Sequence, residues 1–171
     1  FENCRMLSSV TFEKGNLTRI GNWAFYNCHE LQNVVIPEGV SEIGHAAFYG
    51  CAYLSEMTLP STIQEIADNS FAFCSKLQAM HVNASTPPTV YAKTFEEVNR
   101  SIPVYVPEEA VNSYKAAAVW QEFNIVGKKG STSDVDDVQM GKNGIQKLLR
   151  NGQLVIIRDG VEYTIMGAEN K

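Results

Sequence analysis

Apolar residues recur along the first half of the chain with a period of 23 or 24 residues. Phenylalanine followed three positions later by cysteine occurs four times, beginning at Phe1, Phe25, Phe48 and Phe71. A unit of this length cannot enclose a core alone, whereas stacked units bury each apolar column against its neighbour. The pattern therefore predicts a solenoid. Its other core columns are Leu7, Leu31, Leu54 and Leu77; Val10, Val34, Met57 and Met80; Phe12, Ile36, Leu59 and Val82; Leu17, Val40 and Ile63; and Ile20, Ile43 and Ile66.

Each unit contains one short segment that alternates between core and surface. Residues 33–36 place every second side chain in an apolar column, which is typical of a strand with one buried face. Pro37 and Pro60 end these segments, because proline has no N–H to donate. Strands that recur in one direction predict a parallel sheet along one face. Residues 44–48 are too short for a regular helix and predict a helical turn on the opposite face.

Two complete units resemble a known repeat. Residues 31–51 (LQNVVIPEGVSEIGHAAFYGC) and 54–74 (LSEMTLPSTIQEIADNSFAFC) resemble the BspA-like, or Treponema pallidum-type, leucine-rich repeat, and the likeness extends over about residues 1–82. The resemblance implies a leucine-rich-repeat solenoid from a secreted or surface-displayed bacterial protein. Phe73 stands where Asn27 and Gly50 stand, so we do not expect that position to require a left-handed backbone.

The repeat pattern weakens beyond residue 82. Residues 102–107 (IPVYVP) predict one more strand, and residues 108–123 place alanine and tyrosine side chains on one face of a predicted helix. A solenoid end exposes apolar columns and unpaired strand edges, so a helical C-terminal cap has a physical reason to be present. We interpret residues 83–126 as a degenerate capping repeat, which makes residues 1–126 the solenoid domain.

The remainder of the chain predicts a linker and a small tail. Residues 127–133 are polar and rich in glycine and serine, as flexible linkers are. Residues 134–171 contain two alternating segments separated by Asp159-Gly160, a strong turn signal, and predict a β-hairpin tail. At its other end the chain begins inside a repeat, which predicts that it is a C-terminal fragment of a longer solenoid.

Composition narrows the classes of partner. The net charge is -5, and the 14 lysine and arginine residues are scattered instead of forming a basic stripe, so nucleic acid is not an expected partner. Apolar runs are far shorter than the roughly 20 residues that cross a bilayer, so we expect no membrane insertion.

The four cysteines occupy a single column of the repeat, at Cys4, Cys28, Cys51 and Cys74. Neighbours in that column should lie about one strand spacing apart, roughly 4.8 Å, with parallel side chains. A disulfide instead needs Cβ atoms about 3.8 Å apart that point toward each other. We therefore predict four free, buried thiols, with disulfides as the alternative for an exported protein. A metal site needs ligands that converge, which a ladder does not provide.

No arrangement typical of an enzyme emerges from the repeat register. The histidines, His29, His45 and His81, lie in three different columns, so they do not assemble a Cys–His or Ser–His–Asp site. Glu42 and Glu65 share a column with Arg19, which predicts a solvated ladder instead of an acid/base pair. We expect a non-enzymatic protein with no cofactor or metal.

Two surfaces are candidates for recognition. One is the outward column of the predicted sheet, and the other is a set of tyrosines beside the buried phenylalanine column, since tyrosine combines apolar area with a polar tip. The family resemblance implies an adhesin-like module that binds proteins, including host extracellular-matrix or surface proteins. A structural spacer that presents another domain away from the cell is the alternative. The candidate partner-binding residues are Tyr26, Tyr49, Tyr53, Asn33, Val35, Glu56, Thr58 and His81.

Overall fold

A computed structural model describes residues 1–13 and 15–128 in full and, for the later part of the chain, the strands within residues 136–164. The chain divides into two compact units, Phe1–Lys128 and Lys129–Lys171. No helix within the described residues is long and apolar enough to cross a membrane.

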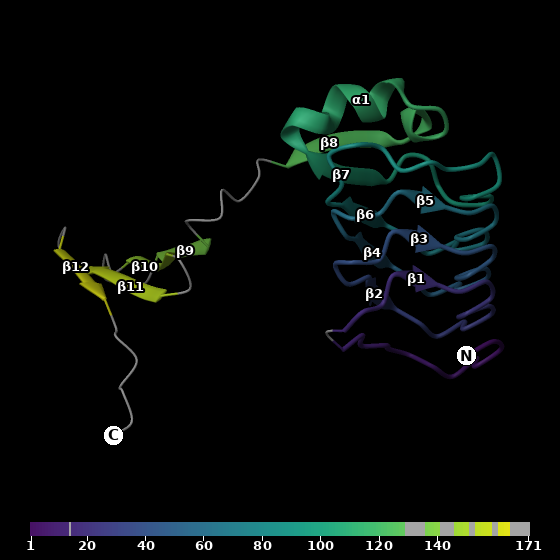
Figure 1. Cartoon of the computed structure of the whole chain (residues 1–171), viewed down its shortest axis with the longest axis horizontal. Coiled ribbons are helices and arrows are strands. Elements are labelled where there is room, and N and C mark those ends of the chain that lie inside the picture. Colours follow the sequence, from purple (N-terminus) through teal and green to yellow (C-terminus); the bar gives the residue numbers. More distant parts are fainter. Residues whose placement is uncertain (14, 129–135, 141–145, 151–152, 159–160, 165–171) are drawn as a thin grey trace. The chain divides into compact units, whose positions relative to one another are not determined.

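The first unit is a solenoid whose coils stack along one axis (Figure 1). One side carries a five-stranded parallel sheet, here called the first sheet, with strand order β2-β4-β6-β7-β8. The predicted parallel sheet is therefore present, and it continues through residues 102–107 into the end of the unit. Its strands are β2 (Asn33–Val35), β4 (Glu56–Leu59), β6 (Ala79–Val82), β7 (Pro103–Pro107) and β8 (Asn124–Lys128).

A second parallel sheet, which the sequence pattern did not predict, forms another side of the coils. It consists of β1 (Arg19–Ile20), β3 (Glu42–Ile43) and β5 (Glu65–Ile66). Each strand has only two residues, of which the isoleucine is buried. Two residues are too few to show alternation in a sequence, so this element is visible only once the coils are stacked.

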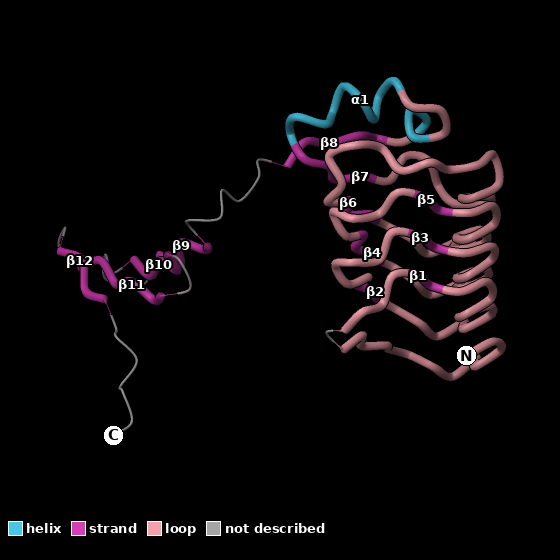
Figure 2. Tube along the Cα trace, viewed as in Figure 1, coloured by secondary structure: helices cyan, strands magenta, loops and turns pink. Residues whose placement is uncertain are grey.

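The third side consists of turns and not of helix (Figure 2). In the coil that contains Phe48, the backbone N–H groups alternate between partners. Ala47 N donates to Gly44 O within the turn, whereas Phe48 N donates to Ser70 O of the next coil at 2.8 Å. The predicted helical turn is therefore replaced by a turn that is hydrogen-bonded to its neighbour, as a strand would be.

The turn position directly before each cysteine has a left-handed backbone, contrary to the sequence-based expectation. The φ angles are 58° at Asn3, 55° at Asn27, 68° at Gly50 and 61° at Phe73. Trp23, Ala46 and Asn69, four residues earlier in their coils, have a left-handed backbone as well. A Cβ added to Gly50 would also clash with the side-chain oxygen of Asn27. The turn geometry is set by the stack, so Phe73 adopts a conformation that bulky residues normally avoid.

The predicted core columns are buried wherever a coil has neighbours on both sides. Leu31, Val34, Ile36, Val40, Ile43 and Phe48 all lie in the core, as do their equivalents in the following coil. The equivalents in the preceding coil are less covered: Leu7, Val10 and Phe12 are only partly buried, and Leu17 is 36% exposed. The prediction was wrong for these four residues, because the first coil of this chain has a neighbour on one side only.

The phenylalanine column is a continuous stack of rings. Centroids lie 5.5 Å apart for Phe1–Phe25, 5.0 Å for Phe25–Phe48 and 5.2 Å for Phe48–Phe71, with interplanar angles of 9–11°. Phe95 extends the stack, with its centroid 5.8 Å from that of Phe71. The repeat therefore continues beyond residue 82.

The stack ends on an aromatic cluster from the end of the unit. Trp120 and Phe123 meet Phe95 edge-on at 5.4 and 5.3 Å. Trp120 Nε1 donates to Pro88 O at 2.9 Å, and the Tyr114 hydroxyl donates to Ala84 O at 3.0 Å. Both polar atoms of these large buried rings are thereby satisfied, as burial requires.

The helix expected over residues 108–123 is divided into three short pieces. These are the 3₁₀ turn Glu108–Ala110, α1 (Val111–Ala116) and the 3₁₀ turn Trp120–Glu122. Ala117 is extended, and Val119 has a φ of 67°, so the backbone reverses between the pieces. The break allows both Tyr114 and Trp120 to reach the core, which a continuous helix would not.

The second unit is larger than the single hairpin expected for the tail. Four antiparallel strands form a sheet in the order β12-β11-β10-β9, with β9 at Asp136–Met140, β10 at Gln146–Arg150, β11 at Gln153–Arg158 and β12 at Val161–Thr164. The Asp159-Gly160 turn lies outside the described residues. Of the predicted linker, Gly127 and Lys128 belong to β8, and residues 129–133 lie outside the described residues.

Replacing Phe48 by alanine should lower the free energy of unfolding by about 3–5 kcal/mol, because a fully buried ring is lost between two stacked rings. Urea unfolding monitored by circular dichroism measures the change. Val35→Ala, at a side chain that is 63% exposed, is the matched control and should change the value by less than about 0.5 kcal/mol. A loss below about 1 kcal/mol for Phe48→Ala would show that the ring stack is not the core.

Candidate partner-binding surfaces

The first sheet presents its outward side chains in straight columns. Parallel strands in register place Val35, Thr58, His81 and Tyr105 side by side, with Val126 next in the same column. The alternate residues point inward and are buried, as at Met57 and Met80. The predicted residues Asn33 and Glu56 are paired in the neighbouring outward column. The structure therefore brings together Asn33, Val35, Glu56, Thr58 and His81 on one face.

His81 is the centre of a small cluster on this face. Its ring stacks on that of Tyr105 with centroids 4.9 Å apart and an interplanar angle of 14°. The Lys128 ammonium lies 5.7 Å from the Tyr105 centroid. Partial burial, with a contribution from the charge of Lys128, lowers the pKa of His81 below its ordinary value. His81 therefore favours the neutral form, which suits a surface that is apolar and aromatic at this end.

Tyr105 and Lys128 were not among the residues chosen from the sequence. A signal for Tyr105 was present, because it alternates with the buried Val104 and Val106 in the segment IPVYVP. Lys128 carried no such signal, because residues 127–133 were interpreted as a linker.

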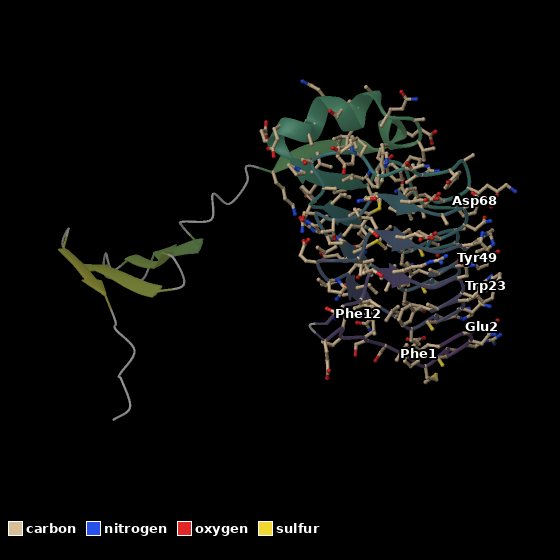
Figure 3. The ribbon with its side chains drawn as sticks, in the orientation of Figure 1. Phe1, Glu2, Phe12, Trp23, Tyr49 and Asp68 are labelled. Atoms are coloured by element: carbon tan, nitrogen blue, oxygen red, sulfur yellow. The ribbon has the colours of Figure 1, made fainter. Side chains whose placement is uncertain are left out.

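At the β2 end of the first sheet, the edge of the outward face is apolar. Val35 is 63% exposed and lies beside a pocket of about 290 Å³ that is also lined by Val10, Phe12, Asn33 and Pro37. Phe12 is visible on this side of the solenoid, away from the flank that carries Trp23 and Tyr49 (Figure 3). The face therefore changes from aliphatic to aromatic along the stack.

An aromatic row follows the turn side of the coils. Tyr26 and Tyr49 stack with centroids 5.0 Å apart, and Phe73 continues the row 5.1 Å from Tyr49. Phe73 joins because the left-handed backbone at its position turns it out of the core, which the sequence interpretation missed. Tyr53, the third predicted tyrosine, is 54% exposed but belongs to a different column and makes no ring contact with the row among the described contacts.

Trp23 adds a further exposed ring on this flank. It meets His45 edge-on at a centroid distance of 5.9 Å, and the flank also carries Tyr49 and Asp68 (Figure 3). Trp23 occupies the repeat position that Ala46 and Asn69 occupy in the following coils. A large ring at a position otherwise held by small residues was the sequence signal for this exposed side chain. The name aromatic flank is used below for Trp23, Tyr26, Tyr49 and Phe73.

The carboxylates of the second sheet form a ladder. Arg19 contacts Glu42 at 3.0 Å, Glu42 is in register with Glu65, and the Tyr91 hydroxyl donates to Glu65 Oε1 at 2.7 Å. Arg19 and Glu42 are both substantially exposed, so water screens the pair. The hydrogen bond to Glu65 raises the pKa of Tyr91. The predicted solvated ladder is present, with Tyr91 as an additional member.

All four cysteines are free, as the column geometry predicted. Each buried thiol donates to the backbone carbonyl of a phenylalanine in the preceding coil: Cys28 to Phe1 at 3.1 Å, Cys51 to Phe25 at 3.3 Å and Cys74 to Phe48 at 3.3 Å. Burial raises the pKa of Cys28 and Cys74, and it raises that of Cys51 to about 12. Cys4 is exposed, so the prediction of four buried thiols was wrong for this residue, which lies in the first coil.

Histidine, cysteine and carboxylate side chains do not converge within the described part of the chain. His29, His45 and His81 lie on different columns, and no group of three or more potential metal ligands occurs among the described residues. The polar groups described above instead extend in rows along the stack.

These observations define a leucine-rich-repeat solenoid with linear surface columns. Residues 1–116 match the family described as the BspA type leucine-rich repeat region, in six copies. The chain therefore belongs to this family. A search of curated proteins gave no match.

The thiols provide a test of the stack. In the folded protein we expect alkylation by iodoacetamide at Cys4 alone, because the reactive thiolate is suppressed at buried positions whose pKa is raised. In denaturant without reductant, all four cysteines should react. Intact mass spectrometry counts the modifications. Fewer than four in denaturant would reveal an oxidised pair, and rapid native alkylation of Cys51 or Cys74 would contradict the packed ladder.

Proposed function

We propose that this chain is a non-enzymatic protein-binding module of a secreted or surface-displayed, adhesin-like bacterial protein. Its partners are extracellular proteins, including host matrix or surface proteins. Family membership supports this proposal, because leucine-rich-repeat modules generally bind proteins and the BspA type is typically found on secreted or surface proteins.

The observation that carries the proposal is the register of outward side chains across the first sheet. Val35, Thr58, His81 and Tyr105 come from four coils and form one continuous column. A partner that lies along this column contacts several coils at once, so recognition is distributed and does not require a pocket. Stacked repeats typically bind through extended surfaces of this kind.

The aromatic flank supports the same function from another side of the coil. Its rings are held by their neighbours at centroid distances of about 5 Å, which leaves little side-chain entropy to lose on binding. Pre-ordered aromatic side chains are common among the residues that dominate interface energy. Either surface, or both, serves an extended protein partner.

The experiment has two stages. The purified chain is first tested for binding to a panel of immobilised extracellular-matrix proteins by biolayer interferometry. Alanine variants of Val35, Thr58 and His81 on the sheet, and of Tyr26, Tyr49 and Tyr53 on the turn side, are then compared for affinity. Truncating a residue that dominates the interface should weaken binding by about 2 kcal/mol, roughly thirtyfold in Kd.

Tyr91→Ala serves as the matched control, because Tyr91 is an exposed tyrosine beside the second sheet. It should leave affinity unchanged, and each variant should keep the wild-type circular dichroism spectrum. A partner whose affinity is unaffected by both sets would place recognition elsewhere. No binding across the panel would instead favour the structural spacer.

A further inference from the structure

Neighbouring coils are joined by a ladder of backbone hydrogen bonds just before each strand of the first sheet. Gln32 N donates to Ser8 O at 3.2 Å, Ser55 N to Gln32 O at 2.8 Å and Gln78 N to Ser55 O at 2.9 Å. A second rung lies slightly earlier in each coil, where Tyr53 N donates to His29 O at 3.0 Å. Lys76 N repeats that rung to Ala52 O at 3.2 Å in the next coil.

This ladder stops at the following coil because of two features of its sequence. Met80 pairs with Val104, which aligns Pro103 with Ala79 of the preceding coil. Ala79 N donates to Ser55 O at 3.4 Å, whereas Pro103 has no N–H to donate to the corresponding carbonyl, Gln78 O. The preceding turn is also one residue longer, with residues 99–101 where the earlier coil has residues 75–76.

The longer turn uses its donors internally. Ser101 N donates to Asn99 Oδ1 at 2.9 Å, and Ile102 N donates to Asn99 O at 3.4 Å. Within the described chain, no backbone N–H donates to Ser75 O or Gln78 O, although both carbonyls correspond to acceptors in every earlier coil. Two acceptors of the ladder are therefore left open at this place.

Arg100, in the middle of this turn, contacts the end of the solenoid and not the preceding coil among its described contacts. Its guanidinium lies 4.7 Å from the ring centroid of Phe123, and its Nε contacts Glu122 Oε2 at 3.4 Å. Phe123 and Glu122 both belong to the C-terminal end of the first unit, so the contacts of Arg100 connect the turn to that end.

A pocket of about 390 Å³ occupies this gap, with residues 75–78 on one side and residues 99 and 101–103 on the other. Leu77 and Ile102 are buried at its base, whereas Ser75, Gln78 and Ser101 are exposed. Lys76 is the one charged residue in the lining, which favours an anionic ligand. This pocket is called the ladder gap below.

We propose that the ladder gap binds an extended, acidic peptide segment of a partner protein. Backbone N–H groups of the peptide donate to Ser75 O and Gln78 O, in place of the missing coil-to-coil bonds. A carboxylate of the peptide pairs with Lys76, and an apolar side chain packs on Pro103. Extended peptides are commonly recognised through their main chain in this way. The site adjoins the first-sheet face at Pro103, which belongs to β7, but it depends on the open carbonyls and does not rest on the function proposed for that face or for the aromatic flank.

The test is an NMR titration of the ¹⁵N-labelled full chain with a capped hexapeptide of alternating aspartate and valine. Shifts should be confined to the amides of residues 75–78 and 99–102. The same peptide with N-methylated backbone nitrogens keeps its charge but loses its donors, and it should bind at least about tenfold more weakly. Because the main chain is the recognised group, the absence of shifts at these amides would overturn the proposal. Equal binding of the two peptides would overturn it as well.

Two variants separate the contributions. Pro103→Gln restores an N–H at the position that corresponds to Ala79, whose N–H donates to Ser55 O, so it should supply a donor to Gln78 O and weaken peptide binding. Lys76→Gln should weaken binding by about threefold, as expected for one exposed ion pair, and lower its salt dependence. Lys115→Gln, an exposed lysine on α1, is the matched control and should leave affinity unchanged. Unchanged affinity in both Pro103→Gln and Lys76→Gln would place the peptide outside the ladder gap.

Discussion

The contact between one column of side chains and the same column in the next coil is the interaction on which the structure depends. In the first unit, strands of two to five residues and turns without regular helix have little stability of their own. The stability comes from stacked phenylalanine rings, whose centroids lie 5.0–5.8 Å apart, and from backbone hydrogen bonds between neighbouring coils. Leu7, Val10 and Phe12, which in this chain pack against a following coil only, are accordingly only partly buried.

The same constraint shapes the chemistry of the surface. Equivalent positions in successive coils form rows along the stack. Carboxylates, thiols and tyrosines therefore lie beside side chains of the same type and do not converge on one point. The thiols illustrate the result: the three buried ones, Cys28, Cys51 and Cys74, donate to backbone carbonyls and have a raised pKa, which makes them packing groups. Rows of side chains favour a partner that lies along several coils. The localised site that we propose, the ladder gap, lies where the repeat period is broken at Pro103.

Much of the fold could be predicted from the period alone. The phenylalanine, cysteine and leucine columns, the first sheet and its outward face all follow from counting residues. The second sheet could not, because two-residue strands carry no pattern. Phe95 and Val98, in the segment 94–98 (TFEEV), continue the phenylalanine and cysteine columns. This repeat was not recognised from the sequence because valine stands in place of cysteine. The left-handed turns were missed because phenylalanine normally avoids a positive φ. The stacked coils impose this conformation on Phe73 nevertheless.

Hydrogen exchange is the most direct test of the claim that coil-to-coil contacts carry stability. The account predicts that amides bonded between fully stacked coils, such as Phe48 N to Ser70 O and Ser55 N to Gln32 O, exchange together in the slowest class. Gln32 N, bonded to the half-covered first coil, should exchange faster. The account would be contradicted if the amides of α1 were the most protected while those of the central coils exchanged as fast as the first coil.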